Sequence, residues 1–280
     1  MLPSFIALLS AFAYGAADFL GGLATHRSTT MAVVIVSQAA GLALLTAVLL
    51  FLPGSLPAAR DLAWGAIAGL AGGGGVALLY RALAIGPMSI VAPLTAVCAA
   101  LIPVAAGVAL GERLTPVRMA GIGLALAAIV LVGQEPRRGA RTAVRWDGLR
   151  TALGSGVLIG LFLVALARAA PDSGLWPLIP ARLASIAMFA AIALATGRSI
   201  RMPAPVVKIA AGGGALDMLA NALYLAAVQR GPLSLMATLA SLYPASTIVL
   251  ARFFLGERLS ASQLGGIAGA VVATVLLVSG

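Results

Sequence analysis

The tetrapeptide Gly111-Glu112-Arg113-Leu114 is repeated without change at Gly256-Glu257-Arg258-Leu259, 145 residues further along the chain. Each copy lies between two long apolar stretches. The same offset pairs other residues in fixed register: Gly15 with Gly160, Ala39 with Ala184, Gly86-Pro87 with Gly231-Pro232, and Gly121 with Gly266. An identical tetrapeptide and an identical Gly-Pro pair in one register indicate an internal duplication.

The composition is that of a membrane protein. Of the 280 residues, 61% are hydrophobic and 9% are charged, whereas about a quarter of the residues of a soluble domain are charged. Runs such as Thr29–Leu52 and Leu259–Gly280 contain no Asp, Glu, Lys or Arg. Because roughly 20 apolar residues suffice to cross a bilayer, the sequence predicts a polytopic, all-α membrane protein.

Ten membrane-spanning helices are predicted, five in each half of the chain. They are expected at 3–24, 30–52, 61–83, 88–110 and 116–133, and at 150–169, 174–196, 206–229, 232–255 and 260–279. A first repeat at 1–133 and a second at 150–280 are joined by a basic linker at 134–149. Since each half has an odd number of helices, the second half starts on the opposite side of the membrane, and the halves are expected to be inverted repeats.

The loop charges predict an orientation. About twice as many Lys and Arg residues fall on the linker side as on the side of the termini. By the positive-inside rule the linker is then cytoplasmic and both termini are external. The net charge of +10 has this topological origin and does not indicate a nucleic-acid partner.

Catalytic and metal-binding patterns are not evident. One cysteine (Cys98), one histidine (His26, in a loop beside Arg27) and eight scattered acids offer neither a metal-ligand cluster nor a Ser-His-Asp arrangement. We therefore expect no enzyme activity, no cofactor and no metal.

The candidate substrate-binding residues are polar groups inside predicted spans, where ionisable side chains are costly unless they face water or one another. Asp217, Asn221 and Tyr224 share one face of helix 206–229 at spacings of four and three residues. They line a cavity or form a hydrogen-bond network that fixes helix packing. Tyr14 and Asp18 have the same spacing in the first helix, where Asp18 is also near enough to the helix end to act as a cap.

Arg182 lies in helix 174–196 and has three possible roles. It neutralises Asp217, neutralises Asp18, or binds a substrate carboxylate through two parallel hydrogen bonds. Gln38 lies beside the first-half counterpart of Arg182, so the two halves differ in polarity. Tyr80 and Tyr243 complete the predicted cavity lining.

Prolines within spans are candidate gating residues, because a proline leaves a backbone carbonyl without its hydrogen bond and permits bending. Pro93 and Pro103 lie in helix 88–110, and Pro244 lies in helix 232–255. The alternative is a packing kink without a gating role. The glycine runs Gly72–Gly75 and Gly212–Gly214 predict close helix packing.

The repeated tetrapeptide has a structural interpretation. Thr115-Pro116 after the first copy predicts an N-cap with proline at N1, and Ser260 and Gln263 after the second copy predict a capping box. Glu112 and Glu257 then lie just before these helices. We expect them to organise the loops rather than to contact substrate.

The two Gly-Glu-Arg-Leu loops, the two Gly-Pro pairs and Tyr14-Gly15 resemble the EamA-domain family of the drug/metabolite transporter superfamily. The resemblance covers the whole chain as two domains. It implies a ten-helix carrier of amino acids, aromatic metabolites or sugars, of a kind often found as exporters in the bacterial inner membrane. It also implies a central site lined by helices 1, 3, 4, 6, 8 and 9, and cytoplasmic termini, which is the opposite of the orientation that the charges predict.

Two functional hypotheses follow. The first is a secondary transporter that moves a small metabolite across the inner membrane by alternating access, in the direction of export. The alternative is a proton-coupled exporter of cationic drugs that uses Asp217 or Asp18. Both require a small-molecule substrate and a lipid bilayer, and the second also requires protons. A membrane-embedded enzyme or a scaffold is a third class, and the lack of a nucleophile with its base disfavours the enzyme.

Overall fold

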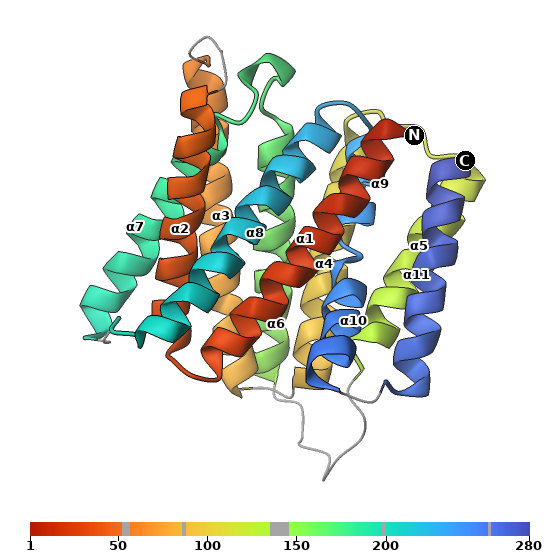
Figure 1. Ribbon diagram of the computed structural model, residues 1–280. Coiled ribbons are helices and arrows are strands. Elements are labelled where there is room, and N and C mark those ends of the chain that lie inside the picture. The colour runs from red at the N-terminus through yellow and green to blue at the C-terminus, as the bar shows by residue number, and fades with distance from the viewer. Residues whose placement is uncertain (52–56, 86–87, 135–145, 198–199, 257–258) are drawn as a thin grey trace.

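The computed structural model describes the chain except for residues 52–56, 86–87, 135–145, 198–199 and 257–258, and at 80, 83–84 and 88–90 it describes the backbone alone. Within that part the chain forms one bundle of helices without strands (Figure 1). The helices are α1 (Leu2–Thr25), α2 (Thr30–Phe51), α3 (Ala59–Ile85), α4 (Met88–Ala109), α5 (Pro116–Val132), α6 (Trp146–Ala167), the 3-10 helix η1 (Pro171–Ser173), α7 (Leu178–Thr196), α8 (Ala204–Val228), α9 (Leu233–Ala240), α10 (Tyr243–Leu255) and α11 (Ala261–Ser279).

Ten spans account for the described helices. Nine of them are long and apolar enough to cross a membrane, and α9 and α10 together form one of these nine (Leu233–Leu255). The tenth, α5, is apolar but has only 17 residues, which is near the lower limit for a span. The prediction of an all-α fold with ten spans is therefore confirmed, and the chain is a multi-pass integral membrane protein.

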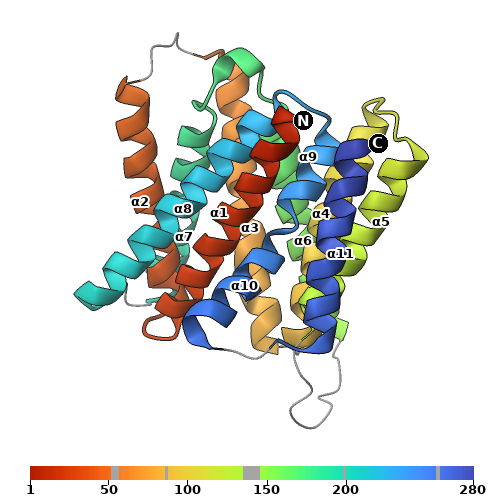
Figure 2. The same ribbon diagram turned by 45° about the vertical axis from the view of Figure 1, so that its right-hand side comes forward.

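The two halves run in opposite directions. Both termini lie at one edge of the bundle, where α1 begins and α11 ends, whereas α5 ends and α6 begins at the opposite edge (Figures 1 and 2). Packing follows the same relation: α1 packs against α8 and α10, just as α6 packs against α3 and α4. We call the two edges the terminal side and the linker side.

Glycines at equivalent positions bring the halves together. A Cβ atom on Gly69 of α3 would lie 2.1 Å from the carbonyl oxygen of Ala181 in α7. Gly214 of α8 is the repeat partner of Gly69, 145 residues further along the chain. A Cβ atom on Gly214 would lie 2.0 Å from the carbonyl oxygen of Ser37 in α2. Only glycine permits these two crossings, and small residues at such contacts are the usual means of close helix packing in membranes. The close-packing interpretation of the run at Gly212–Gly214 is confirmed at Gly214.

Three predicted helices differ from the observed ones. The helix predicted at 150–169 begins earlier, at Trp146, and the one predicted at 174–196 begins later, at Leu178, after η1 and a turn in which Gly174 has a φ of 54°. The helix predicted at 232–255 is interrupted between α9 and α10. Pro244 explains the interruption, because it has no N–H to donate to the carbonyl of Ala240 one turn earlier.

The predicted caps are confirmed. The Thr115 side chain accepts a hydrogen bond from the Arg118 backbone N–H at 3.2 Å, and Pro116 follows as the first residue of α5. Ser260 and Gln263 form a complete capping box at the start of α11, with hydrogen bonds of 3.0 and 3.2 Å.

The glycine crossings generate a stability prediction. Gly69→Ala and Gly214→Ala should each lower the free energy of unfolding by about 1–3 kcal/mol, because the added methyl group overlaps a backbone carbonyl that cannot move aside. Thermal unfolding in detergent measures the effect. Gly123→Ala is the matched control, since a Cβ atom there meets nothing within 4 Å and alanine favours the helix. Equal melting temperatures for the three variants would contradict this account of the packing.

Candidate functional site

A central cavity of about 740 Å³ lies between the two halves, within the size range typical of small-molecule sites. On the linker side its lining reaches the ends of α1, α5 and α10, at His26, Gly133 and Leu255. Towards the terminal side, fully buried apolar side chains close it, among them Leu225 and Leu239. The cavity therefore opens towards the linker side. His26, expected in a solvated loop, is exposed at this mouth.

An ion pair lies in the lining of the cavity. Arg182 of α7 donates to the carboxylate of Asp217 in α8, and its other terminal nitrogen donates to the side-chain oxygen of Gln38 in α2. The side chains of Arg182 and Asp217 are 10% and 35% exposed. Of the three possible roles for Arg182, the structure shows the pairing with Asp217.

The ion pair belongs to a larger hydrogen-bond network. The Asn221 side-chain amide donates to the Asp217 carbonyl at 2.7 Å and to the Asp217 carboxylate at 3.3 Å. The Tyr14 hydroxyl donates to the Asn221 side-chain oxygen at 2.9 Å, and Gln38 donates to the Ser185 hydroxyl at 3.1 Å. The network connects α1 and α2 of the first half with α7 and α8 of the second.

Asp18 is the second acid in the cavity wall and lies outside this network. It is one turn from Tyr14 on α1, nearer the linker side, and its side chain is exposed in the cavity. In the described part of the chain no hydrogen bond or ion pair to Asp18 is formed. Tyr243 also lines the cavity, and its ring centroid is 6.2 Å from that of Tyr14. Asp18 thus shares the cavity lining with the rings of Tyr14 and Tyr243.

The remaining candidates are distributed differently. Pro93 and Pro244 line the cavity, whereas Pro103 is buried in α4 away from it. Tyr224 is fully buried and outside the lining, and its hydroxyl donates to the Leu163 carbonyl at 3.0 Å, which fixes α8 on α6. The side chain of Tyr80 lies outside the described residues.

The lining also contains small hydroxyl residues that were not predicted from the sequence. Thr95 and Ser241 both line the cavity, and so do their repeat partners Ala240 and Ala96. The offset of 145 could have revealed them, because it relates lining positions of the two halves. Thr95 and Ser241 are small, uncharged residues of types common in membrane helices, so nothing else in the sequence marks them as cavity residues.

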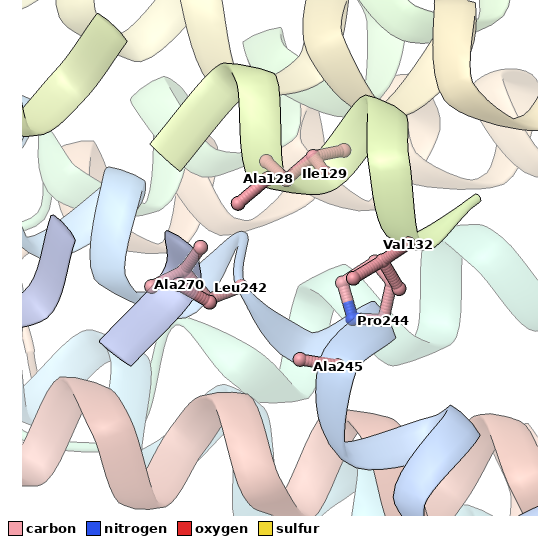
Figure 3. Close-up of a pocket in the computed structure, with 7 residues that line it drawn as sticks. All are labelled: Ala128, Ile129, Val132, Leu242, Pro244, Ala245 and Ala270. Carbon is pink, nitrogen blue, oxygen red and sulfur yellow. The ribbon is translucent and has the colours of Figure 1, made fainter. Parts of the chain in front are cut away.

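A second, much smaller pocket lies beside the interruption between α9 and α10. Leu242, Pro244 and Ala245 at the interruption face Ala128, Ile129 and Val132 of α5 and Ala270 of α11 (Figure 3). Its lining is apolar and it is too tight to hold a water molecule. It is a packing contact that supports the interruption, and Pro244 takes part in both this contact and the cavity wall.

Comparison with known proteins identifies relatives of the whole chain. The sequence profile of the EamA-like transporter family matches residues 1–134 and 147–279. A solved structure described as "Crystal structure of protein" is similar with a TM-score of 0.79 and 20% sequence identity, over 98% of this chain and 95% of its own. At that identity the likeness shows the fold alone. The curated proteins searched gave no match.

The ion pair generates a double-variant prediction. Arg182→Gln and Asp217→Asn should each lower the free energy of unfolding by about 1–3 kcal/mol, because each leaves the other charge without its partner. This range is below that of a fully buried pair, because Asp217 is partly exposed. The double variant should lose less free energy of unfolding than the two single variants lose together. Chemical denaturation in detergent measures all three, with Arg60→Gln on the exposed start of α3 as the control. Additive losses would contradict the pairing.

Proposed function

The chain belongs to the EamA-like transporter family, and from that premise we propose that it is a secondary carrier which moves a small metabolite by alternating access. Membership makes the protein a membrane transporter with a small-molecule substrate. The observation that supports this mechanism is a cavity lined by both halves, whose lining reaches the linker-side ends of α1, α5 and α10. Because inverted repeats can exchange their conformations, the same cavity opens to the terminal side in the second state.

The two walls of the cavity differ in polarity, which supports an amphipathic substrate. Tyr14 and Asp18 of α1 correspond by the repeat offset to Ile159 and Leu163 of α6, and all four line the cavity. The part of the wall formed by α1 is therefore polar, and the equivalent part formed by α6 is apolar.

The same contrast holds for the second pair of helices. Asp217 and Asn221 of α8 correspond to Gly72 and Val76 of α3, again all in the lining. A solute with a polar head and an apolar body fits such a cavity, as an aromatic amino acid or a related aromatic metabolite does.

The charge of the cavity favours an ammonium group on the polar head. Arg182 neutralises Asp217, so the carboxylate of Asp18 is the charge left for a substrate. Aromatic faces attract cations, and Tyr14 and Tyr243 are both in the lining.

We propose that the direction is export from the cytoplasm across a bacterial inner membrane. The cavity opens towards the linker side, which the distribution of Lys and Arg assigns to the cytoplasm. Loading from that side and release on the terminal side is export.

The alternative is a proton-coupled exporter of cationic drugs. The absence of a partner for Asp18 in the described part of the chain favours this residue over Asp217 as the group that exchanges a proton for the substrate. Asp217 already has Arg182 and Asn221 as partners.

A flux assay in proteoliposomes tests the function and separates the alternatives. Aromatic amino acids, sugars and cationic dyes are offered with and without a pH gradient. Flux of an ammonium-bearing aromatic solute that does not need the gradient supports the carrier. Asp18→Asn should then weaken transport at least tenfold by raising KM. If the protein is the proton-coupled exporter, Asp18→Asn should abolish gradient-driven dye flux.

Two variants serve as controls for this assay. Asp147→Asn, in the first turn of α6 and outside the cavity, should leave flux unchanged. Ala99→Trp fills the cavity that Ala99 lines and should block transport. Flux of no solute class above that of Ala99→Trp would contradict the transport proposal.

A further inference from the structure

Glu112, in the loop between α4 and α5, makes a contact that the cavity does not explain. Its carboxylate accepts hydrogen bonds from the backbone N–H groups of Leu233 and Ser234, at 2.5 and 3.0 Å, and from the Ser234 hydroxyl. Leu233 is the first residue of α9. One acid of the first half thus caps a helix of the second half across the interface between them.

The loop is built to hold the carboxylate in this place. Gly111 has a φ of 95°, a left-handed conformation that glycine adopts readily, and it turns the chain back so that the Glu112 N–H donates to the Gly107 carbonyl at 3.0 Å. A Cβ atom on Gly107 would lie 2.5 Å from a carboxylate oxygen of Glu112. Glycine at both positions is required to present the acid to α9.

The capped helix is one of the elements that close the terminal side, together with the end of α8 that carries Leu225. Every residue of α9 from Leu233 to Ala240 is buried, and α9 packs against α1 and α4 of the first half. Ala240 and Ser241, at its other end, line the cavity. A path from the cavity to the terminal side along α9 therefore separates this helix from α1 and α4.

We propose that Glu112 is a latch, which holds the terminal side closed while the cavity is open to the linker side and which must release α9 for the second state. The charged carboxylate is well suited to this role, since it satisfies N–H groups that the helix itself cannot and lies at the positive end of the helix dipole. The inference rests on the proposed alternating access. It gives Glu112, in the first copy of the repeated tetrapeptide, a role in gating rather than in substrate binding.

A thiol-accessibility assay in nanodiscs tests the latch without substrate. Ala237→Cys, at a fully buried position of α9, reports opening of the terminal side in a Cys98→Ser background. Glu112→Gln keeps the size of the side chain but leaves one oxygen as acceptor and removes the charge. It should raise the labelling rate of the reporter about tenfold. Ser234→Ala, which removes one of the three hydrogen bonds, should raise it less.

Two comparisons separate a latch from a general loosening of the loops. Arg113→Gln changes the neighbouring exposed residue and should leave the labelling rate unchanged. Glu257→Gln is the same substitution in the second copy of the tetrapeptide, and it should not expose the reporter at Ala237→Cys. Melting temperatures confirm that each variant is folded.

An unchanged labelling rate in folded Glu112→Gln would overturn the latch, and so would an equal increase in Glu257→Gln. If Glu112→Gln fails to fold, Ser234→Ala decides, because it retains the acid and two of its hydrogen bonds. Either negative result would leave the transport proposal standing, since the flux assay tests that separately.

Discussion

Within a bilayer no water is available to the backbone, so each N–H and C=O group must be bonded inside the chain, and spans are helical except where protein buries the backbone, as between α9 and α10. This constraint shapes the rest of the molecule. Each half of the chain forms five spans, and an odd number of spans inverts the second half relative to the first. The repeated sequence then meets itself in opposite orientations, and the cavity lies where the two halves meet.

The two halves make equivalent backbone contacts, but they place different side chains in the cavity. Gly69 and Gly214, one offset apart, allow equivalent helix crossings. The side chains that face the cavity differ at equivalent positions, with Asp217 in one half and Gly72 in the other. Equivalent packing in the two halves is what the proposed exchange of conformations requires, while the unequal walls give the site one polar and one apolar side.

Polar groups in the protein interior are arranged so that their contacts bridge the halves. The ion pair of Arg182 and Asp217 also engages Gln38 of the first half. On the terminal side, the Asp61 carboxylate accepts from the Ala170 N–H at 3.0 Å, and Arg168 lies 5.9 Å over the ring of Trp64. Together with Glu112, Asp61 and Arg168 add contacts between the halves on the side that is closed. Towards the linker side the halves are joined by other hydrogen bonds, from Ser37 to the Ala210 carbonyl and from Thr95 to the Ala152 carbonyl.

Much of the fold and part of the site could be predicted from the sequence. The span count, the inversion and the caps at Thr115 and Ser260 follow from local patterns, because hydropathy and cap residues act over a few residues. The spacing of Asp217, Asn221 and Tyr224 correctly indicated one helix face, but it did not show that Tyr224 packs against α6 outside the cavity. The end of α9 and the partner of Glu112 depend on contacts between the halves, which a single sequence does not specify.

We propose that the two halves exchange conformations, so that one mouth of the cavity closes as the other opens. Spin-label distances across both mouths test it most directly, in nanodiscs and a Cys98→Ser background. One label pair at Arg113→Cys and Arg230→Cys spans the terminal side, and one at Arg81→Cys and Leu255→Cys spans the linker side. On addition of a transported solute, the terminal pair should gain a longer distance while the linker pair gains a shorter one. Distances that stay single and unchanged, or that lengthen together at both mouths, would contradict it.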